Sequence, residues 1–450
     1  PDGMVVSLVL DRALPFTGNN VLLANDQKRI EIAPTMNENG DRNYEIRVTE
    51  GSDGEFLKSN PWIETPVVPW DRVAEDSKKG EEYATIAQAN AWLYGLYGQK
   101  REVAKGAERL RALADKGSEK ARAALDQSVL REAGEGDADA VGKILAAGAK
   151  VDTVGAQGTT SLMLAARGGH GDAVKALLAA KADVNAARPD GATALLAAAE
   201  GGHGDTVKAL LVAGANVGAA RSNGMTALMA AASKGHDDAA GVLLAAKANV
   251  DAARSNGATA LMLAALEGHG GVIKALLAAG ANVNAAGHDG ATALILAASG
   301  GHGDVVKALL AATAKVNVTM RDGGTALMAA AEGGHGEIAA LLLGAKADVD
   351  AAGPDGMTAL MLAAREGHGD AVETLLAADA EAIATMGNGM TALMLAARGG
   401  HGDAVKALLA DTGEVNATMH NGTTALMLAA NGGHGEMTAA LLAAKADVNA

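Results

Sequence analysis

Cysteine is absent from this sequence, and aromatic residues are scarce. Its 450 residues include no Cys, 2 Phe, 3 Trp and 4 Tyr, and without cysteine neither disulfides nor thiolate catalysis is possible. No run of about 18 uninterrupted apolar residues occurs, so no membrane span is predicted. Because the 49% hydrophobic content is largely Ala and Leu, the composition favours an elongated, soluble, non-enzymatic protein.

Positive charge is in deficit along the whole chain. Residues 1–126 carry 21 acids and 17 bases, residues 127–450 carry 32 and 21, and the net charge is −15. A nucleic acid partner is therefore disfavoured, since phosphate binding depends on an excess of Lys and Arg. The chain begins at Pro1 without a charged and apolar leader, which fits a processed, mature protein and equally a trimmed or incomplete chain.

A unit of 33 residues recurs nine times between Gly158 and Ala450. Each copy contains a Thr-Ala-Leu-Met type segment, a Gly-His pair and an Ala-Leu-Leu type segment, and the nine inter-segment histidines from His170 to His434 are each 33 residues apart. A degenerate copy precedes them, with Ile144-Leu145 in phase. A fixed period of this length is typical of stacked repeat architectures.

The local signals within one copy predict two short helices joined by a glycine turn. Thr193 is placed to cap a helix over Ala194–Glu200, which Gly201-Gly202 would end. Asp205 would open a second helix with leucines at helical spacing. Asp-Gly and Asn-Gly pairs between copies predict tight turns. Neither helix is long enough to be stable alone, so the copies must stack on one another.

These units resemble the ankyrin repeat over about residues 125–450. The resemblance is carried by the turn Asp190-Gly191, the helix start Thr193-Ala194-Leu195, the pair Gly202-His203 and the pair Leu210-Leu211. It implies a mostly α fold, a solenoid of ten helix-turn-helix units with projecting β-turns, and binding of protein partners. One departure is systematic: where the family has Thr-Pro-Leu-His, this chain has Thr-Ala-Leu-Met. The family's His joins neighbouring repeats by hydrogen bonds, so we expect stacking here to depend on apolar contacts rather than on a polar network.

The residues before the array predict a small β-rich domain and a helical cap. Met4–Leu10 is an apolar strand candidate, and Lys28–Ala33 with Tyr44–Thr49 alternate as a hairpin. A later segment rich in Pro and Trp is interpreted as a linker, with a polyproline-type ligand as the alternative. The helical segment that follows resembles a single Sel1-like or tetratricopeptide pair, and we expect it to cap the array. The predicted domains are 1–60 (β-rich), 61–78 (Pro/Trp connector), 79–124 (helical cap) and 125–450 (array).

No catalytic, metal or cofactor site is predicted. Equivalent atoms of neighbouring repeats would lie roughly 10 Å apart, whereas zinc ligands lie about 2 Å from one ion. The nine periodic histidines are therefore interpreted as structural residues of the inter-helix turn. His288 and His420 are additional, and we expect them to be solvated residues at turn tips. No phosphate-loop motif occurs, and the glycines are better explained as helix caps.

Two surfaces are candidates for protein binding: the turn tips and the concave face that the first helices would form. The candidate turn-tip residues are Arg188, Arg221, Arg254, His288, Arg321 and His420. The candidate concave residues are Arg167, Glu200, Lys234, Glu267, Glu332, Arg365, Arg398 and Asn431. These positions lack Tyr and Trp, which usually anchor protein interfaces.

The last copy keeps the apolar residues of interior copies, and this predicts association through the two ends of the chain. Terminal repeats normally carry a polar outer face, whereas a heterologous contact between two ends builds an open filament. The candidate contact residues are Met4, Val6, Leu8, Leu10, Trp62, Trp70, Leu426, Leu441, Leu442 and Val448. We therefore expect a structural rod that assembles head to tail outside the cell or on its surface. The alternative is a monomeric adaptor that binds a separate protein through its turn tips and concave face.

Overall fold

The computed structural model describes residues 20–25, 28–36, 42–49, 77–78, 82–96, 100–411 and 414–449. Its contacts divide the chain into two compact units, Pro1–Glu132 with Asp139–Thr153 and Ala133–Ala138 with Val154–Ala450. The second unit contains the nine regular copies of the repeat.

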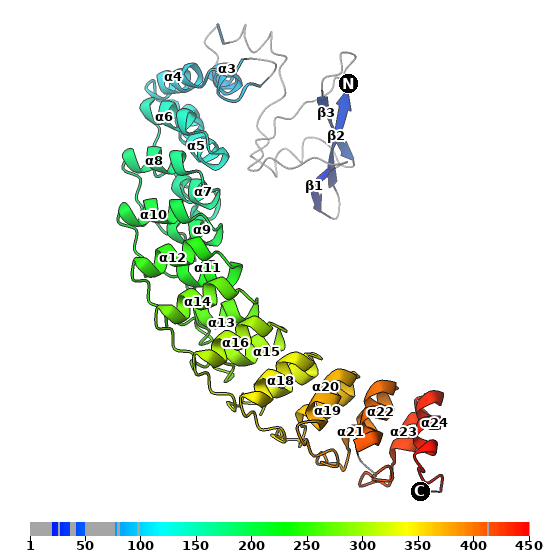
Figure 1. The fold of residues 1–450 in the computed structure, drawn as a ribbon. Helices are drawn as coiled ribbons and strands as arrows, with labels where there is room; N and C mark the ends of the chain where they lie inside the picture. Colours follow the sequence, from blue (N-terminus) through cyan, green and yellow to red (C-terminus); the bar gives the residue numbers. More distant parts are fainter. Residues whose placement is uncertain are drawn as a thin grey trace. The chain divides into compact units, whose positions relative to one another are not determined.

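Three strands pair in the first unit. They are β1 (Asn20–Asn25), β2 (Lys28–Met36) and β3 (Arg42–Thr49), and they form an antiparallel sheet in the order β1-β2-β3 (Figure 1). Ile30 lies opposite Val48, so β2 and β3 pair along the two segments that the alternating pattern assigns to a hairpin. Residues 1–60 as a separate domain stay a prediction, and Met4–Leu10 lies outside the described residues.

Helices complete the described part of this unit. They are α3 (Glu82–Tyr94), α4 (Val103–Ala114), α5 (Glu119–Glu135) and α6 (Ala138–Ala146). α3 and α4 pack closely at Gly106, where a Cβ atom would lie 2.6 Å from the Ala89 carbonyl oxygen. Gly106 therefore permits an approach that any larger residue would prevent.

Cationic side chains join α5 to the helical pair before it. The Arg131 guanidinium lies 4.0 Å from the ring centre of Tyr94, and the Arg101 side chain forms an ion pair with buried Glu132. Arg101 also donates from Nε to the Leu93 carbonyl at 3.0 Å. The capping role of residues 79–124 stays a prediction, and its expected boundary near residue 125 falls inside α5.

Each regular copy of the repeat forms two helices. In chain order the pairs are α7 (Ser161–Arg167) and α8 (Gly171–Ala179), α9 (Ala194–Glu200) and α10 (Gly204–Val212), α11 (Ala227–Lys234) and α12 (Asp237–Ala245), α13 (Ala260–Leu266) and α14 (Gly270–Ala278), α15 (Ala293–Ser299) and α16 (Gly303–Ala311), α17 (Ala326–Glu332) and α18 (Gly336–Gly344), α19 (Ala359–Glu366) and α20 (Gly369–Leu376), α21 (Ala392–Gly399) and α22 (Gly402–Asp411), and α23 (Ala425–Asn431) and α24 (Gly435–Ala443). A 3-10 turn, η1 (Ala156–Gly158), precedes α7.

The predicted caps and helix bounds are confirmed in the third copy. The Thr193 hydroxyl accepts a hydrogen bond from the Leu196 amide at 3.4 Å, and α9 ends at Glu200 before Gly201. The second helix, α10, begins one residue earlier than predicted, at Gly204. Helices of 7 and 9 residues are too short to be stable alone.

Packing between copies supplies the missing stability. First helices contact first helices, as α9 contacts α7 and α11, and second helices contact second helices, as α10 contacts α8 and α12. The two resulting layers can be followed along the array in Figure 1. Leu195 and Leu210 are 1% and 0% exposed, so the core lies between the layers and continues from copy to copy.

A polar network also joins the copies, and the prediction of stacking by apolar contact without such a network is wrong. The Nε2 atom of His203 lies 3.0 Å from the Arg167 carbonyl oxygen of the preceding copy. Because a carbonyl only accepts, Nε2 carries the hydrogen and donates. The histidines that form this bond are His170, His203, His236, His302, His335, His368 and His434. The histidine of the Gly-His pair thus forms the cross-repeat bond that Thr-Ala-Leu-Met lacks.

A second set of bonds crosses the same interfaces at the end of each copy. The Asn185 Oδ1 atom accepts a hydrogen bond from the Asn216 amide at 2.8 Å. Side-chain oxygens of Asp251, Asn284, Asn317, Asp350 and Asn416 accept equivalent bonds. The repeated Asn or Asp near the end of each copy therefore holds the following copy in register.

Each bridging histidine packs on a glycine of the preceding copy. Gly202 has a φ of +78°, and a Cβ atom there would lie 2.5 Å from the Nδ1 atom of His236. Both the left-handed backbone and the close contact require glycine at this position. The glycine and the histidine of the Gly-Gly-His pattern thus act together across copies, because the glycine of one copy packs against the histidine of the next.

We expect Leu261→Ala to lower the free energy of unfolding by about 2–5 kcal/mol, because it leaves a cavity in the core. Leu261 is 2% exposed. The matched control is Leu266→Ala in the same helix, where the side chain is 43% exposed and the effect should be within about 0.5 kcal/mol. Reversible urea unfolding measures both changes, and equal effects would place Leu261 outside the core.

We expect Gly202→Ala to destabilise the array by at least about 1 kcal/mol more than Gly214→Ala, because overpacking adds to the left-handed strain. Gly214 has a φ of +93°, but a Cβ atom there would meet nothing within 4 Å, so this glycine isolates the backbone cost. In a His236→Ala background the excess cost of Gly202→Ala should vanish. Chemical denaturation of the four variants measures these differences. An excess that persists without the imidazole would contradict the glycine–histidine contact.

Candidate protein-binding surface

A four-residue turn precedes each first helix. In the fourth copy the Gly224 amide donates to the Arg221 carbonyl at 2.8 Å, and Gly224 has a φ of +82°. The Asn223 Oδ1 atom accepts from the Met225 amide at 3.0 Å. These bonds explain why Asn-Gly or Asp-Gly occupies the last two positions of the turn: the Asn or Asp side chain accepts from the amide that follows the turn, and the glycine adopts the left-handed backbone.

Backbone hydrogen bonds join these turns into a row. The Ser222 amide donates to the Asp190 carbonyl at 2.8 Å, and the Ser255 amide donates to the Asn223 carbonyl at 3.0 Å. The same bond recurs at His288, Arg321, Gly387 and His420. Pro354 has no amide hydrogen and cannot donate at this position. We call these linked turns the turn row.

Two positions of the turn row carry the variable side chains. The first turn position holds Arg188, Arg221, Arg254, Gly287, Met320, Gly353, Met386 and Met419. The second turn position holds Pro189, Ser222, Ser255, His288, Arg321, Pro354, Gly387 and His420. Core positions of these copies are almost invariant by comparison, so chemical variety is concentrated here.

The structure separates the six predicted turn-tip residues into two groups. Arg188, Arg221 and Arg254 occupy the first turn position and are half-buried. The other three, His288, Arg321 and His420, occupy the second turn position and are exposed. The sequence analysis did not distinguish these two groups, although their positions within the 33-residue repeat differ by one residue.

Arg221 connects the turn row to the first helices. Its guanidinium lies 2.9 Å from the Glu200 carboxylate at the end of α9, and Arg167 lies 3.6 Å from the same carboxylate. Two of the predicted concave residues are thereby brought together with one predicted turn residue. We call the first turn position, together with the carboxyl ends of the first helices, the turn–helix surface.

The three arginines of the first turn position differ in their side-chain contacts. Arg188 donates to the Gln157 side chain at 2.8 Å, and its Nε lies 3.6 Å from the Asp190 carboxylate, too far for a hydrogen bond. Arg254 has no ion-pair partner among the residues that the structure describes. The position equivalent to Glu200, which pairs with Arg221, is Ser233 in the next copy.

The Nε atoms of these three arginines are buried and have no hydrogen-bond acceptor. A buried donor without an acceptor costs about 1–3 kcal/mol. The side chains of Arg188 and Arg221 are 24% and 26% exposed, so their stems are packed while part of each guanidinium reaches solvent. Folding alone gives no reason to repeat this arrangement in three successive copies.

Methionine replaces arginine farther along the turn row. Met320, Met386 and Met419 hold the first turn position in later copies and are half-buried. The sequence reasoning did not select them, although their distances from Arg254 are multiples of the repeat length. Methionine side chains are flexible and polarizable, and they are frequent on adaptable binding surfaces.

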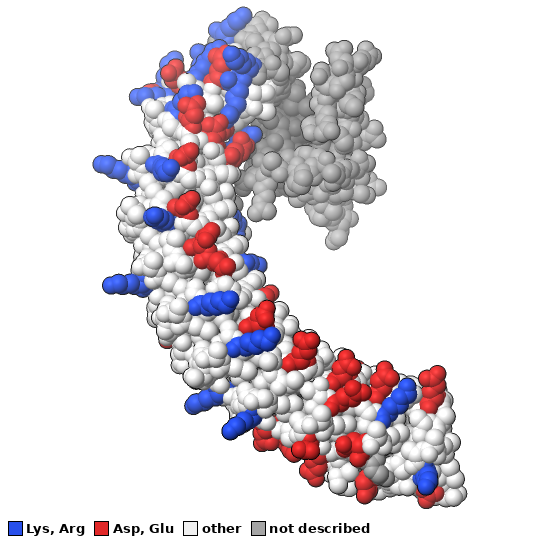
Figure 2. All heavy atoms as spheres, viewed as in Figure 1, with Lys and Arg blue, Asp and Glu red and all other residues white. Residues whose placement is uncertain are grey.

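Charge also changes along the array. Residues 154–286 carry 9 acids and 10 bases, whereas residues 287–449 carry 18 acids and 8 bases, a net charge of −10. Acidic side chains accordingly gather over the part of the array that holds α19 to α24 in Figure 2. Hydrogen bonding to Glu366, with a further contribution from Glu332, raises the pKa of Arg365 above its usual value, so this arginine stays charged.

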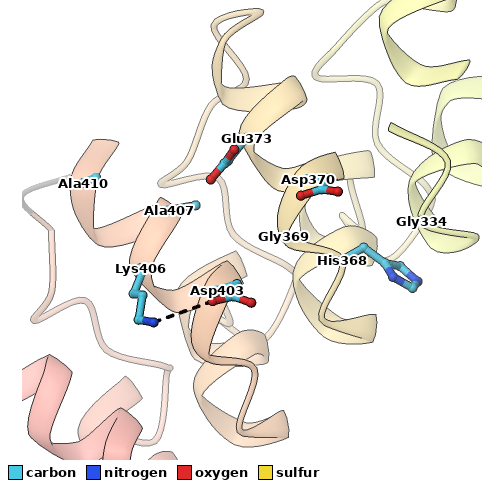
Figure 3. Close-up of a pocket in the computed structure, with 9 residues that line it drawn as sticks. All are labelled: Gly334, His368, Gly369, Asp370, Glu373, Asp403, Lys406, Ala407 and Ala410. Carbon is cyan, nitrogen blue, oxygen red and sulfur yellow. Dashed lines mark ion pairs between the residues drawn. The ribbon is translucent and has the colours of Figure 1, made fainter. Parts of the chain in front are cut away.

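A hollow lies in the second-helix layer. It has a volume of about 460 Å³, and Figure 3 shows His368, Asp370 and Glu373 on the side of α20 and Asp403 and Lys406 on α22. Lys406 and Asp403 form an ion pair at 3.6 Å. No Ser, Thr or Cys lines the hollow. In the described part of the chain, no group of three or more His, Asp or Glu residues could hold a metal ion.

The predicted end-to-end contact residues are only partly placed. Met4, Val6, Leu8, Leu10, Trp62 and Trp70 lie outside the described residues. Leu442 and Val448 are 44% and 69% exposed, and Leu426 is half-buried. Leu441 is 0% exposed, so its assignment as a contact residue is wrong: it packs inside the last copy. Met427 belongs to the same apolar set of the last copy and is 41% exposed.

The stacked helix pairs and the turn row define a repeat solenoid. The chain belongs to the ankyrin repeat family, because the family described as "Ankyrin repeats (3 copies)" matches overlapping segments that together span residues 127–450. Ankyrin repeats are protein-interaction modules, and the chain therefore belongs to a class of proteins that bind other proteins.

The chain is also similar to a solved structure, the human ASB11 ankyrin repeat domain. The identity is 29%, the match covers 50% of this chain and 99% of the other, and the TM-score is 0.46. The curated proteins contain no match. No helix in the described ranges is long and apolar enough to cross a membrane.

Proposed function

We propose that this protein is a non-enzymatic adaptor whose turn–helix surface binds a segment of a separate protein partner. The observation that supports this most directly is the trio of arginines in the first turn position. The side chains of Arg188 and Arg221 are 24% and 26% exposed, so the carboxylates of a partner can reach the ends of their guanidinium groups and accept charge-assisted hydrogen bonds.

The distribution of sequence variety also favours an adaptor. Buried positions such as Leu195, Leu228 and Leu261 repeat the same residue, because stacking requires one shape at every interface. The first turn position instead alternates among Arg, Gly and Met. A rod with a purely structural role would not need this variety on one row of its surface.

The adaptor proposal predicts that partners are lost when the turn–helix surface is neutralised. The test variant is Arg221→Ala with Arg254→Ala, and the matched control is Lys175→Ala with Lys208→Ala on the second-helix layer. Both variants remove two positive charges. Quantitative mass spectrometry of proteins bound from the source cells should show a severalfold selective loss for the test variant. Identical sets of bound proteins for both variants would contradict the proposal.

As a second candidate, we propose head-to-tail association of copies of the chain. It is favoured by the exposed apolar side chains of α23 and α24, Met427 and Leu442, which are 41% and 44% exposed. The equivalent Met394 of the preceding copy is 1% exposed, because α23 covers it. Another copy could cover the same face of the last repeat, and so could further residues in a longer chain. A filament outside the cell or on its surface belongs to this second proposal.

Head-to-tail association predicts a mass that rises with protein concentration in sedimentation analysis. Met427→Glu with Leu442→Glu should abolish the rise, because a charge cannot be buried unpaired in an apolar contact. The control is Val212→Glu with Leu266→Glu, two apolar side chains that are 83% and 43% exposed in the middle of the array. A wild-type chain that stays monomeric over a wide concentration range would rule out this candidate.

A further inference from the structure

The turn row sets the spacing of Arg188, Arg221 and Arg254. Arg188 and Gly191 are the ends of one four-residue turn, so their Cα atoms lie within about 7 Å of each other. A Cβ atom on Gly191 would lie 3.0 Å from the Arg221 Cα, and one on Gly224 would lie 2.9 Å from the Arg254 Cα. The Cα atoms of successive arginines are therefore at most about 11 Å apart, and the usual spacing of packed helices, about 8–10 Å, lies within this limit.

Positive charge is in excess around these arginines. Together with Arg167 on α7 they place four guanidinium groups along the turn–helix surface. The carboxylate that meets them from the first helices is Glu200, which Arg167 and Arg221 already share. At the turns, Asp190 stays 3.6 Å from the Nε of Arg188. Two carboxylates, Glu200 and Asp190, therefore face four guanidinium groups on the surface from Arg167 to Arg254, which leaves a local excess of positive charge.

We propose that this basic stretch of the turn–helix surface binds an extended acidic segment of a partner protein, with carboxylates at every third residue. A polyproline II helix rises about 3.1 Å per residue and has three residues per turn. Its side chains at every third position therefore point the same way and lie about 9 Å apart. This spacing matches the row of arginines, and each carboxylate would accept hydrogen bonds from one guanidinium. The inference rests on the proposed function as an adaptor.

The later part of the turn row limits the length of the acidic stretch. After Arg254 the first turn position is Gly287 and then Met320, and residues 287–449 have a net charge of −10. A uniformly charged polyanion such as a nucleic acid would be repelled beyond the arginines. A protein segment can change from acidic to apolar residues where the surface changes from Arg to Met, so it fits both parts.

The probe is a fluorescent peptide of four Glu-Pro-Pro triplets, titrated against the full chain while its anisotropy is followed. A second peptide of the same composition has its glutamates in one block. We expect the periodic peptide to bind several times more tightly than the block peptide, and its binding to weaken as salt is added. An oligothymidylate of similar length is the third probe and should bind more weakly than either peptide.

Variants of the chain assign the binding to the arginines. Arg254→Ala should weaken binding of the periodic peptide about tenfold, because a charge-assisted hydrogen-bonded pair is lost. Arg254→Lys should fall between Arg254→Ala and the wild type, since it keeps the charge without the planar fork. Glu200→Gln should strengthen binding, because it removes the carboxylate that competes for Arg221. The matched control, Lys208→Ala on α10 in the second-helix layer, should bind like the wild type, and circular dichroism checks that every variant is folded.

Three results would overturn the inference: equal binding of the periodic and block peptides, wild-type affinity in Arg254→Ala, or tighter binding of the oligothymidylate through the same arginines. A second experiment distinguishes failure of this inference from failure of the adaptor proposal. In it, peptides that bind the full chain are selected from a random displayed library. If the selected peptides lose binding in Arg221→Ala with Arg254→Ala but contain no acidic triplets, the adaptor proposal holds and the inference of an acidic partner is wrong. If the selected peptides bind this double variant as tightly as the wild type, both the adaptor proposal and the inference of an acidic partner are contradicted.

Discussion

Contact between neighbouring repeats is the constraint on which the whole array depends. Helices of 7 and 9 residues cannot hold their own backbone hydrogen bonds in water. Each helix is therefore stable only when its Leu and Ala face is covered by the equivalent helix of the next copy. This requirement keeps the core residues uniform, and it also explains why small residues recur where the helices approach most closely.

Polar contacts make that stacking specific. An apolar face of Ala and Leu could slide along its neighbour with little loss of buried area. The bond from His203 to the Arg167 carbonyl and the bond from the Asn216 amide to Asn185 each have one correct geometry. The first lies at the turn between the two helices and the second lies after the second helix, so together they fix both position and rotation. This arrangement requires a glycine beneath each imidazole, because a side chain there would collide with the ring.

The same regularity presents the variable residues as a row. Because the turns are bonded to one another through Ser222, Ser255 and their equivalents, side chains at the first turn position are held at a constant spacing. Arg188, Arg221 and Arg254 become one charged strip, although they are far apart in sequence. A repetitive core thus produces a linear row of side chains, whose identity is free to vary without disturbing the fold.

The sequence by itself determined the period, the helix pairs, the caps such as Thr193 and the tight turns, because these depend on residues close together in the chain. It also indicated the turn row as a candidate surface for partner binding. Tertiary structure decided which side chains meet across copies: His203 with a carbonyl 36 residues earlier, Arg221 with Glu200, and Leu441 inside the core rather than on the outer face. Such contacts depend on how far each copy is rotated and shifted against the next, and that geometry is set by the packing of whole helices rather than by any local signal.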